Sequence, residues 1–228
     1  MGQNRVIVES QSGVTLAGGA PFSGRELARA RRFAPVLVAA DGGADRLLRL
    51  GAEPQAVIGD FDSISLPAKT LLADRLFPIS EQITTDFDKA LRSITAPFVL
   101  GLGFAGARAD HGLAVLNALV RHQDRRCLIL SGSDVSFLAP RALRLRLPVG
   151  TRLSLFPMGS VRGQSRGLRW PIAGIDFAPD GMIGTSNEVS DPQVDLTVDA
   201  ARLLVILPVR SLPAVLRGFG LLSDAPAR

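Results

Sequence analysis

The chain has 228 residues, of which 46% are hydrophobic, 21% charged and 5% aromatic, and its formal net charge is +5. This composition excludes a disordered tail, a collagen-like fibre and a disulfide-stapled miniprotein. The length is sufficient for one large domain or two small ones, each with a buried core, and we expect two.

The cysteine content and the hydrophobic pattern indicate a reducing compartment and no membrane span. Cys127, the only cysteine, lies in the apolar run 127–130, so neither an intramolecular disulfide nor a multi-cysteine metal site can form. No uninterrupted stretch of about 18 apolar residues occurs, as a membrane-spanning helix would require. We therefore expect a soluble, cytoplasmic protein.

The positive net charge alone would favour nucleic-acid binding, because a basic surface attracts phosphates. The arginines are scattered, however, and their densest groups, within 29–32 and 141–146, are not interleaved with aromatic residues. With no tyrosine and one tryptophan, side chains for stacking on bases are scarce. We expect no nucleic-acid partner. A non-enzymatic basic binding module remains a rival hypothesis, which a salt-dependent shift with DNA or RNA would identify.

Residues 1–135 alternate short apolar runs with helical patterns, which is typical of a parallel sheet with crossover helices. The predicted strands are 5–8, 14–17, 36–40, 56–58, 76–79, 98–102 and 127–130. The predicted helices, with apolar residues three and four apart, are 24–32, 44–50, 86–94 and 110–121. The pattern predicts a Rossmann-like α/β domain.

After residue 135 the pattern changes to strict alternation. In 141–147 leucines and arginines alternate, as in a half-buried antiparallel strand, and residues 153–155 and 194–198 repeat this period of two. Proline and glycine turns separate these runs. We therefore predict that 136–228 is all-β and forms an antiparallel β-sandwich.

Five aspartates follow predicted strands in the first half of the chain. They are Asp41, Asp60, Asp62, Asp86 and Asp110. Ligands bind outside the carboxyl ends of the strands in an open parallel sheet, so these side chains should converge. Converging carboxylates raise one another's pKa unless a cation neutralises them, and an all-oxygen ligand set favours Mg²⁺. Asp41, Asp86 and Asp110 also precede helical patterns, so helix capping is the alternative.

Small-residue loops lie at the same expected edge of the sheet. Gly18-Gly19, Gly42-Gly43 and the segment 101–108 would expose N–H groups that can hold phosphate, or would simply make tight turns. Arg108 could donate a forked pair of hydrogen bonds to phosphate oxygens, although a surface arginine is the alternative. The spacing of Gly101, Gly103 and Gly106 does not make a dinucleotide site, because acidic loops surround it.

Several short motifs follow one another over nearly the whole chain. They are Ala40-Asp41-Gly42-Gly43-Ala44, Gly59-Asp60-Phe61-Asp62-Ser63, Thr85-Asp86, Gly106-Ala107-Arg108-Ala109-Asp110-His111 with Asn117, Gly167-Leu168-Arg169-Trp170 and Thr185-Ser186-Asn187. In this combination and order they resemble the motifs of the thiamine pyrophosphokinase family.

The resemblance implies transfer of the diphosphate of ATP to the hydroxyl of thiamine, with Mg²⁺, release of AMP, and a homodimer whose active sites lie at the subunit interface. The implied ligands of Mg²⁺ and the phosphates are Asp60, Asp62 and Asp86, beside Asp41. The implied nucleotide-binding residues are Asp41, Gly42, Gln82, Arg108, Asp110 and His111. Trp170 would stack on thiamine, and Ser186 and Asn187 would hydrogen-bond to it.

The residue chemistry is compatible with this reaction, because phosphoryl-type transfer relies on positioning and charge neutralisation more than on a covalent nucleophile. Trp170 lies in a polar stretch, and its indole could face a cationic thiazolium or could anchor a core or an interface. The remaining alternative is another Mg-dependent α/β phosphotransferase or nucleotide-binding enzyme that acts on a small cationic or heterocyclic substrate.

Overall fold

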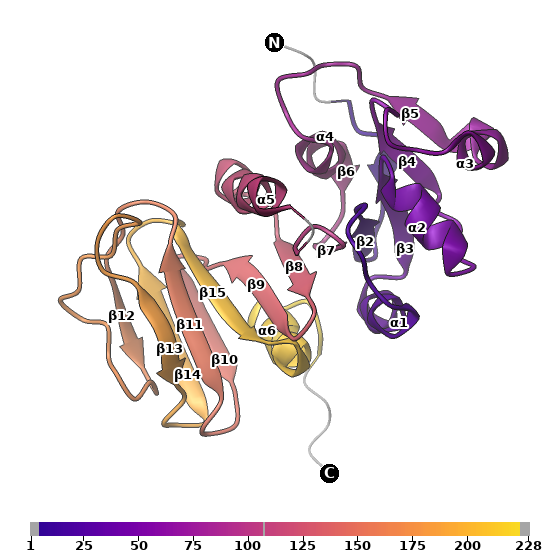
Figure 1. Ribbon diagram of the computed structural model, residues 1–228. Helices are drawn as coiled ribbons and strands as arrows, with labels where there is room; N and C mark the ends of the chain where they lie inside the picture. The colour runs from indigo at the N-terminus through magenta and orange to yellow at the C-terminus, as the bar shows by residue number, and fades with distance from the viewer. Residues whose placement is uncertain (1–4, 107, 224–228) are drawn as a thin grey trace. The chain divides into compact units, whose positions relative to one another are not determined.

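The computed structural model describes residues 5–106 and 108–223 (Figure 1). The chain divides into two compact units, Met1–Gly132 (unit 1) and Ser133–Arg228 (unit 2). The sequence pattern placed the division after residue 135. Each unit is described by itself.

Unit 1 is built on a parallel sheet with the strand order β8-β7-β2-β3-β4-β5, in which every neighbouring pair is parallel. These strands are β2 (Val14–Ala17), β3 (Val36–Ala40), β4 (Ala56–Gly59), β5 (Leu76–Pro78), β7 (Val99–Leu102) and β8 (Cys127–Ser131). All four residues of β2, β4 and β7 are buried, as in a sheet that is covered on both faces. The predicted strands of this sheet are confirmed to within one or two residues.

Helices connect the parallel strands of unit 1. They are α1 (Gly24–Phe33), α2 (Gly43–Arg49), α3 (Leu66–Leu71), α4 (Asp86–Arg92) and α5 (Ala109–Arg121), with a 3₁₀ turn at Ala73–Arg75. α3 was not predicted. The segment predicted as strand 5–8 contributes only the two-residue β1 (Val8–Glu9), which pairs with β6 (Ile94–Thr95). From β2 the chain adds β3, β4 and β5 in one direction along the sheet, whereas β7 and β8 are added on the opposite side of β2. The strand order therefore reverses between β2 and β7, which makes a switch point there.

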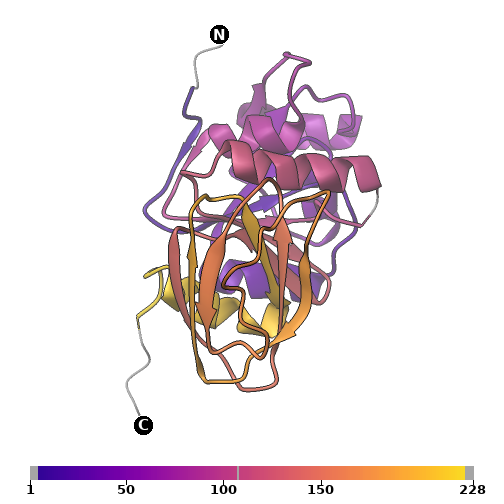
Figure 2. The ribbon, with the colours of Figure 1, turned by 90° about the vertical axis from the view of Figure 1, so that its left-hand side faces the viewer.

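Unit 2 contains two sets of antiparallel strands, β13-β11-β15-β9 and β10-β14-β12 (Figures 1 and 2). The strands are β9 (Asp134–Leu138), β10 (Ala142–Arg146), β11 (Arg152–Pro157), β12 (Gly163–Arg166), β13 (Gly184–Glu188), β14 (Gln193–Val198) and β15 (Leu203–Pro208). The alternation in 141–147 is confirmed, because Leu143 and Leu145 are buried while Arg144 and Arg146 are exposed.

The prediction that the second half is all-β was wrong, because it ends in the helix α6 (Leu212–Gly218). Leu212, Val215 and Leu216, spaced three and four apart, are completely buried. Gly218 lies against β10, where an added Cβ would be 2.6 Å from the Arg144 carbonyl oxygen. The helix has only seven residues, and its few apolar positions are too short a run to show a helical period in the sequence.

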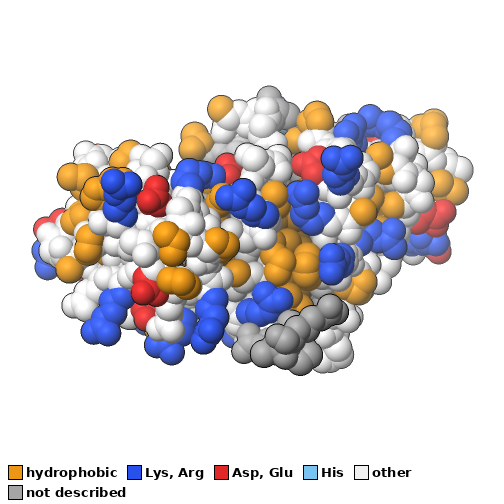
Figure 3. Space-filling model, turned by 90° about the horizontal axis from the view of Figure 1, so that it is seen from below, with side chains coloured by type: hydrophobic (Ala, Val, Ile, Leu, Met, Phe, Trp, Pro, Cys, Tyr) orange, Lys and Arg blue, Asp and Glu red, His pale blue; other side chains and the backbone are white. Residues whose placement is uncertain are grey.

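The described part of the chain contains no helix that is long and apolar enough to cross a membrane. On the face shown in Figure 3, Lys and Arg side chains lie among hydrophobic and neutral ones.

Candidate active site

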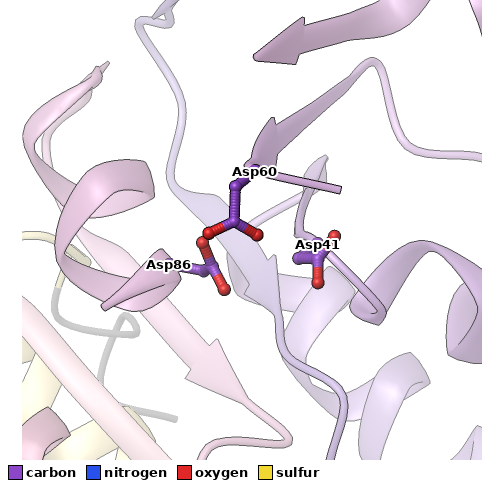
Figure 4. Close-up of side chains that lie close together, drawn as sticks. All are labelled: Asp41, Asp60 and Asp86. Atoms are coloured by element: carbon purple, nitrogen blue, oxygen red, sulfur yellow. The ribbon is translucent and has the colours of Figure 1, made fainter. Parts of the chain in front are cut away.

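Three aspartate side chains from different parts of unit 1 converge at one edge of its sheet. Asp41 directly follows β3, Asp60 directly follows β4, and Asp86 is the first residue of α4. One carboxylate oxygen from each lies within 4.8 Å of the others, and the three groups point toward one another (Figure 4). We call these three residues the acidic cluster. It forms because the carboxyl ends of neighbouring parallel strands meet at the same edge.

Helix capping does not explain these aspartates. The N-cap residue of α2 is Gly42, that of α4 is Thr85, whose hydroxyl accepts a hydrogen bond from the Asp88 N–H, and that of α5 is Arg108. Asp41 therefore precedes the cap of its helix, and Asp86 follows the cap of its own. Their carboxylates are free for another role.

Asp41 is the most buried member of the acidic cluster, with 3% of its surface exposed. Its Oδ2 accepts a hydrogen bond from the Ser63 N–H at 3.0 Å, whereas its buried Oδ1 has no hydrogen-bond partner among the described residues. Burial raises the pKa of Asp41 to about 6, and the neighbouring carboxylates of Asp86 and Asp62 add to this effect. A buried carboxylate oxygen without a partner is costly unless a cation or a donor reaches it.

Lys89 is the cationic partner of the other two aspartates. Its side chain is 2% exposed, and its Nζ lies 3.0 Å from Asp60 Oδ2 and 3.0 Å from Asp86 Oδ1. Burial alone would lower the pKa of Lys89, but hydrogen bonds and charges from the two aspartates outweigh it and raise the pKa. The hydrogen bond from Lys89 is also the largest cause that lowers the pKa of Asp60.

Sequence reasoning missed Lys89. A lysine is almost never fully buried unless it is paired, so a lone lysine in a helical pattern is ordinarily assigned to the surface. The available signal was the spacing, because residues three apart on a helix are neighbours and Lys89 is three residues after Asp86. Lys89 is also one of only two lysines in the chain.

The backbone at the acidic cluster is unusual for residues with side chains. Among residues 5–106 and 108–223, the only non-glycine residues with positive φ are Asp41 (42°), Phe61 (65°) and Ser186 (61°). Such conformations cost about 1 to 3 kcal/mol each and concentrate at functional sites. At Gly59 an added Cβ would lie 2.9 Å from the Asp41 Cβ, so a glycine is required there for the carboxylates to approach.

The acidic cluster fits a hard divalent cation. All of its potential ligands are carboxylate oxygens, which Mg²⁺ prefers, and the partnerless Oδ1 of Asp41 supplies a buried acceptor for a cation. Asp62, predicted as a ligand, is exposed and lies outside the group of three, with its Oδ1 accepting a 2.7 Å hydrogen bond from the Ser63 hydroxyl.

The residues predicted to bind the nucleotide lie in unit 1, and several of them form hydrogen bonds or ion pairs with other side chains. Gln82 donates to Asp60 Oδ2 at 3.3 Å, and His111 is exposed in the first turn of α5. Arg108 forms a two-point pair with Asp110, with 2.6 Å between its Nη2 and Oδ2, and this pair lowers the pKa of Asp110 to about 2. Both side chains are more than 60% exposed, so Arg108 is accessible to an anion. Ala107 of the same motif lies outside the described residues.

The glycine loops at this edge include one that is explained by packing. Gly18 follows β2 and Gly103 follows β7, and an added Cβ on Gly18 would lie 2.5 Å from the Gly103 carbonyl oxygen. This contact shows that the glycines allow two backbones to approach at the switch point.

The residues predicted to bind thiamine lie together in unit 2. Trp170 follows β12 and is 54% exposed, which excludes a buried core anchor. Ser186 lies exposed in β13, and its N–H donates to the buried Ser154 Oγ at 3.0 Å. The side chain of Asn187 is buried and hydrogen-bonds to the main chain of Trp170.

Two family models match the chain, one in each unit. Residues 28–130 match "Thiamin pyrophosphokinase, catalytic domain", and residues 143–203 match "Thiamin pyrophosphokinase, vitamin B1 binding domain". The first matched segment contains the acidic cluster and Lys89. The second contains Trp170, Ser186 and Asn187.

Curated relatives match over most of their length. The chain is 30% identical over 214 residues to thiamine pyrophosphokinase 1 of Oryza sativa subsp. japonica, covering 75% of this chain and 81% of the relative. It is 28% identical over 217 residues to thiamine pyrophosphokinase 1 of Arabidopsis thaliana, covering 77% and 81%.

Solved structures share the mixed α/β fold. Thiamin pyrophosphokinase from Candida albicans matches with a TM-score of 0.74 and 15% identity, over 91% of this chain and 95% of that chain. Thiamin pyrophosphokinase from Geobacillus thermodenitrificans matches with a TM-score of 0.70 and 21% identity, over 86% and 97%. At these identities the likeness establishes the fold.

Proposed function

We propose that the acidic cluster is the centre of the reaction that this chain catalyses. The chain belongs to the thiamine pyrophosphokinase family and catalyses the ATP-dependent diphosphorylation of thiamine. The observation that carries the proposal is the convergence of Asp41, Asp60 and Asp86, one carboxylate oxygen of each within 4.8 Å of the others, at a site where Asp41 Oδ1 has no hydrogen-bond partner among the described residues. In the reaction, the thiamine hydroxyl oxygen forms a bond to the β-phosphorus of ATP. The bond between this phosphorus and the oxygen of the α-phosphate breaks, AMP leaves with its electron pair, and the hydroxyl proton passes to water.

The residues of unit 1 would hold the polyphosphate in position for this transfer. Asp41, Asp60 and Asp86, with Asp62 beside them, would hold Mg²⁺. When bound, Mg²⁺ supplies positive charge to the phosphate oxygens. Lys89 holds Asp60 and Asp86 in place through its two hydrogen bonds and lowers the pKa of Asp60.

The remaining predicted contacts complete the nucleotide side of the proposal. Arg108 would exchange its exposed pair with Asp110 for a two-point contact with phosphate oxygens, which suits a planar guanidinium. Gly42, Gln82 and His111 would provide further contacts with ATP.

We assign these roles to two domains, as the sequence pattern predicts: an ATP and Mg²⁺ domain over 1–135 and a thiamine-binding and dimerisation domain over 136–228. A Rossmann-like arrangement of the first is supported by its parallel strand order. A β-sandwich in the second is supported by its two antiparallel sets of strands.

The raised pKa of the buried Asp41 predicts that the stability of the metal-free protein depends on pH. Its folded-state pKa of about 6 exceeds the ordinary value of 3.8, so without metal the stability that its proton provides is lost as the pH rises from about 4 through 6. The amide side chain that Asp41→Asn introduces cannot ionise. The unfolding temperature of this variant minus that of the wild type, both measured in EDTA, should therefore be higher at pH 7.5 than at pH 4.5.

Adding Mg²⁺ at pH 7.5 completes this test. The wild type should be stabilised because the folded state alone offers the assembled ligands, whereas Asp41→Asn should be stabilised much less. Equal Mg²⁺-induced shifts in the two proteins would contradict a metal role for Asp41 independently of any activity measurement.

Trp170 is proposed to stack on the thiamine ring. Trp170→Ala should weaken thiamine binding by about 5- to 30-fold, which corresponds to about 1 to 2 kcal/mol for a partly desolvated cation–π contact. The KM for ATP should change little, and Trp170→Phe should keep part of the contact because a ring face survives. Titration of both substrates checks this, and equal weakening of both would indicate a structural role instead.

We also propose a homodimer in which each active site uses residues of both subunits. Mixing an inactive Asp60→Asn protein with a Trp170→Ala protein, which binds thiamine weakly, should then restore part of the activity at subsaturating thiamine, because each heterodimer has one site with both residues intact. Absence of recovery after verified subunit exchange would favour a site within one chain.

A further inference from the structure

We infer that Asn187 is a positioning residue that fixes the main chain of Trp170 and so presents the Trp170 indole to thiamine. The inference rests on the proposed role of Trp170 in thiamine binding, and it assigns to Asn187 a role other than direct contact with the substrate.

The side chain of Asn187 hydrogen-bonds to both main-chain polar groups of Trp170, and we call this pair of hydrogen bonds the bracket. It is 6% exposed, and its Nδ2 donates to the Trp170 carbonyl oxygen at 2.7 Å. Its Oδ1 accepts hydrogen bonds from the Trp170 N–H at 3.2 Å and from the Glu188 N–H at 2.8 Å. The amide thus satisfies both main-chain polar groups of Trp170, as the peptide group of a neighbouring strand would.

These bonds leave little capacity for a direct contact with a substrate. An asparagine side chain has two N–H donors and one carbonyl acceptor with two lone pairs. Both acceptor positions and one donor are already used by Trp170 and Glu188. A hydrogen bond from Asn187 to thiamine would have to use the second N–H or break an existing bond.

The chain on either side of Trp170 is also fixed. Gly167 turns with a φ of 77°, and an added Cβ there would lie 2.1 Å from the Gln193 carbonyl oxygen, so this turn requires glycine. The Arg169 N–H donates to the Glu188 carbonyl oxygen at 2.8 Å, and the Ile172 N–H donates to Ser165 Oγ at 3.2 Å. The main chain is held at points before, at and after Trp170.

The indole contrasts with this fixed backbone, because more than half of the Trp170 side chain is exposed. The Arg169 guanidinium lies over the ring, 5.0 Å from its centroid, and pairs with Glu188 at 3.5 Å. An exposed aromatic ring on a fixed main chain has less conformational freedom to lose on binding, which favours a binding platform over a core residue. Asn187 is the side chain that hydrogen-bonds to the main chain from which this ring projects.

Fluorescence tests the bracket without any ligand. Trp170 is the only tryptophan and the chain has no tyrosine, so intrinsic emission reports this residue alone. Asn187→Ala should increase quenching by acrylamide and lower the emission anisotropy relative to the wild type. Gln164→Ala, which removes an exposed amide side chain on neighbouring β12, should change neither. Unaltered Trp170 emission in Asn187→Ala would overturn the inference.

A double-mutant cycle separates positioning from direct contact. Asn187→Ala should raise the dissociation constant for thiamine by no more than Trp170→Ala does, about 5- to 30-fold, with the KM for ATP unchanged. In the Trp170→Ala background, Asn187→Ala should add less than about twofold, because its effect passes through the indole. Full additivity would overturn the inference and indicate direct contact with thiamine.

A second variant and the result for Trp170→Ala separate a failure of this inference from a failure of the proposed role of Trp170. If Asn187→Ala does not fold, as judged by circular dichroism, Asn187→Ser removes the amide that bonds to both main-chain groups of Trp170 but keeps a polar hydroxyl at the buried position, and the same cycle applies. If Trp170→Ala leaves thiamine affinity unchanged, both the proposed role of Trp170 and this inference are contradicted. If Trp170→Ala weakens thiamine binding but the effect of Asn187→Ala is additive, only the inference is contradicted.

Discussion

Replacing Asp60 by asparagine is expected to lower kcat by about 10²- to 10³-fold, the loss typical of removing one electrostatic contact to a transition state. Asp60 lies close to the buried Asp41 and to Asp86, the first residue of α4, and its Oδ2 accepts the hydrogen bond from Lys89 at 3.0 Å. Asparagine keeps the size of the side chain and an acceptor for Lys89 but removes the negative charge. Turnover at saturating ATP, thiamine and Mg²⁺ measures the effect.

The matched control is Asp74→Asn, at a position whose side chain is 81% exposed in the same unit. Its turnover should remain close to that of the wild type. An Asp60→Asn protein that folds, as checked by circular dichroism, and turns over at the wild-type rate would show that the acidic cluster is not the reaction centre.

The second large effect is expected for Lys89→Met, which should lower the free energy of unfolding by about 2 to 3 kcal/mol in the absence of metal. Removing one partner of a buried ion pair leaves the other charges uncompensated, and the partial exposure of Asp60 and Asp86 reduces the full penalty. Turnover should fall as well, because the two carboxylates lose the cation that fixes them. Urea unfolding in EDTA provides the measurement.

Arg75→Met supplies a comparison with a surface ion pair. Arg75 pairs with Glu53 at 2.9 Å, and both side chains are at least one third exposed, so the expected loss is about 0 to 1 kcal/mol. If Lys89→Met and Arg75→Met have the same small effect, the interpretation of Lys89 as a buried counter-charge is wrong. Partial recovery of Lys89→Met stability with Mg²⁺ is the further expected result, since Mg²⁺ would replace the lost charge.

The parallel sheet of unit 1 was predictable because buried parallel strands are short, continuous apolar runs bounded by turn residues. The convergence of Asp41, Asp60 and Asp86 followed from the same pattern, since the ends of such strands share one edge. The sequence could not distinguish Asp60 from Asp62, because two residues so close together diverge only through the local backbone, where Phe61 has a φ of 65°.

Features that depend on long-range packing were not predictable from local patterns. Besides the nearby Asp86, the buried Lys89 pairs with Asp60, which is 29 residues away in the sequence. The bracket between Asn187 and Trp170 joins residues 17 positions apart, and no sequence spacing encodes it. α6 was missed because its stability comes from burial against β10 and not from a long periodic run.

The most direct test of the reaction is identification of its products. The protein is incubated with ATP, thiamine and Mg²⁺, and the phosphorus-containing products are resolved by ³¹P NMR. Transfer of the diphosphate predicts AMP and thiamine diphosphate in equal amounts, with no ADP as an intermediate. Formation of ADP together with a thiamine monophosphate, or release of inorganic phosphate with thiamine unchanged, would contradict the account.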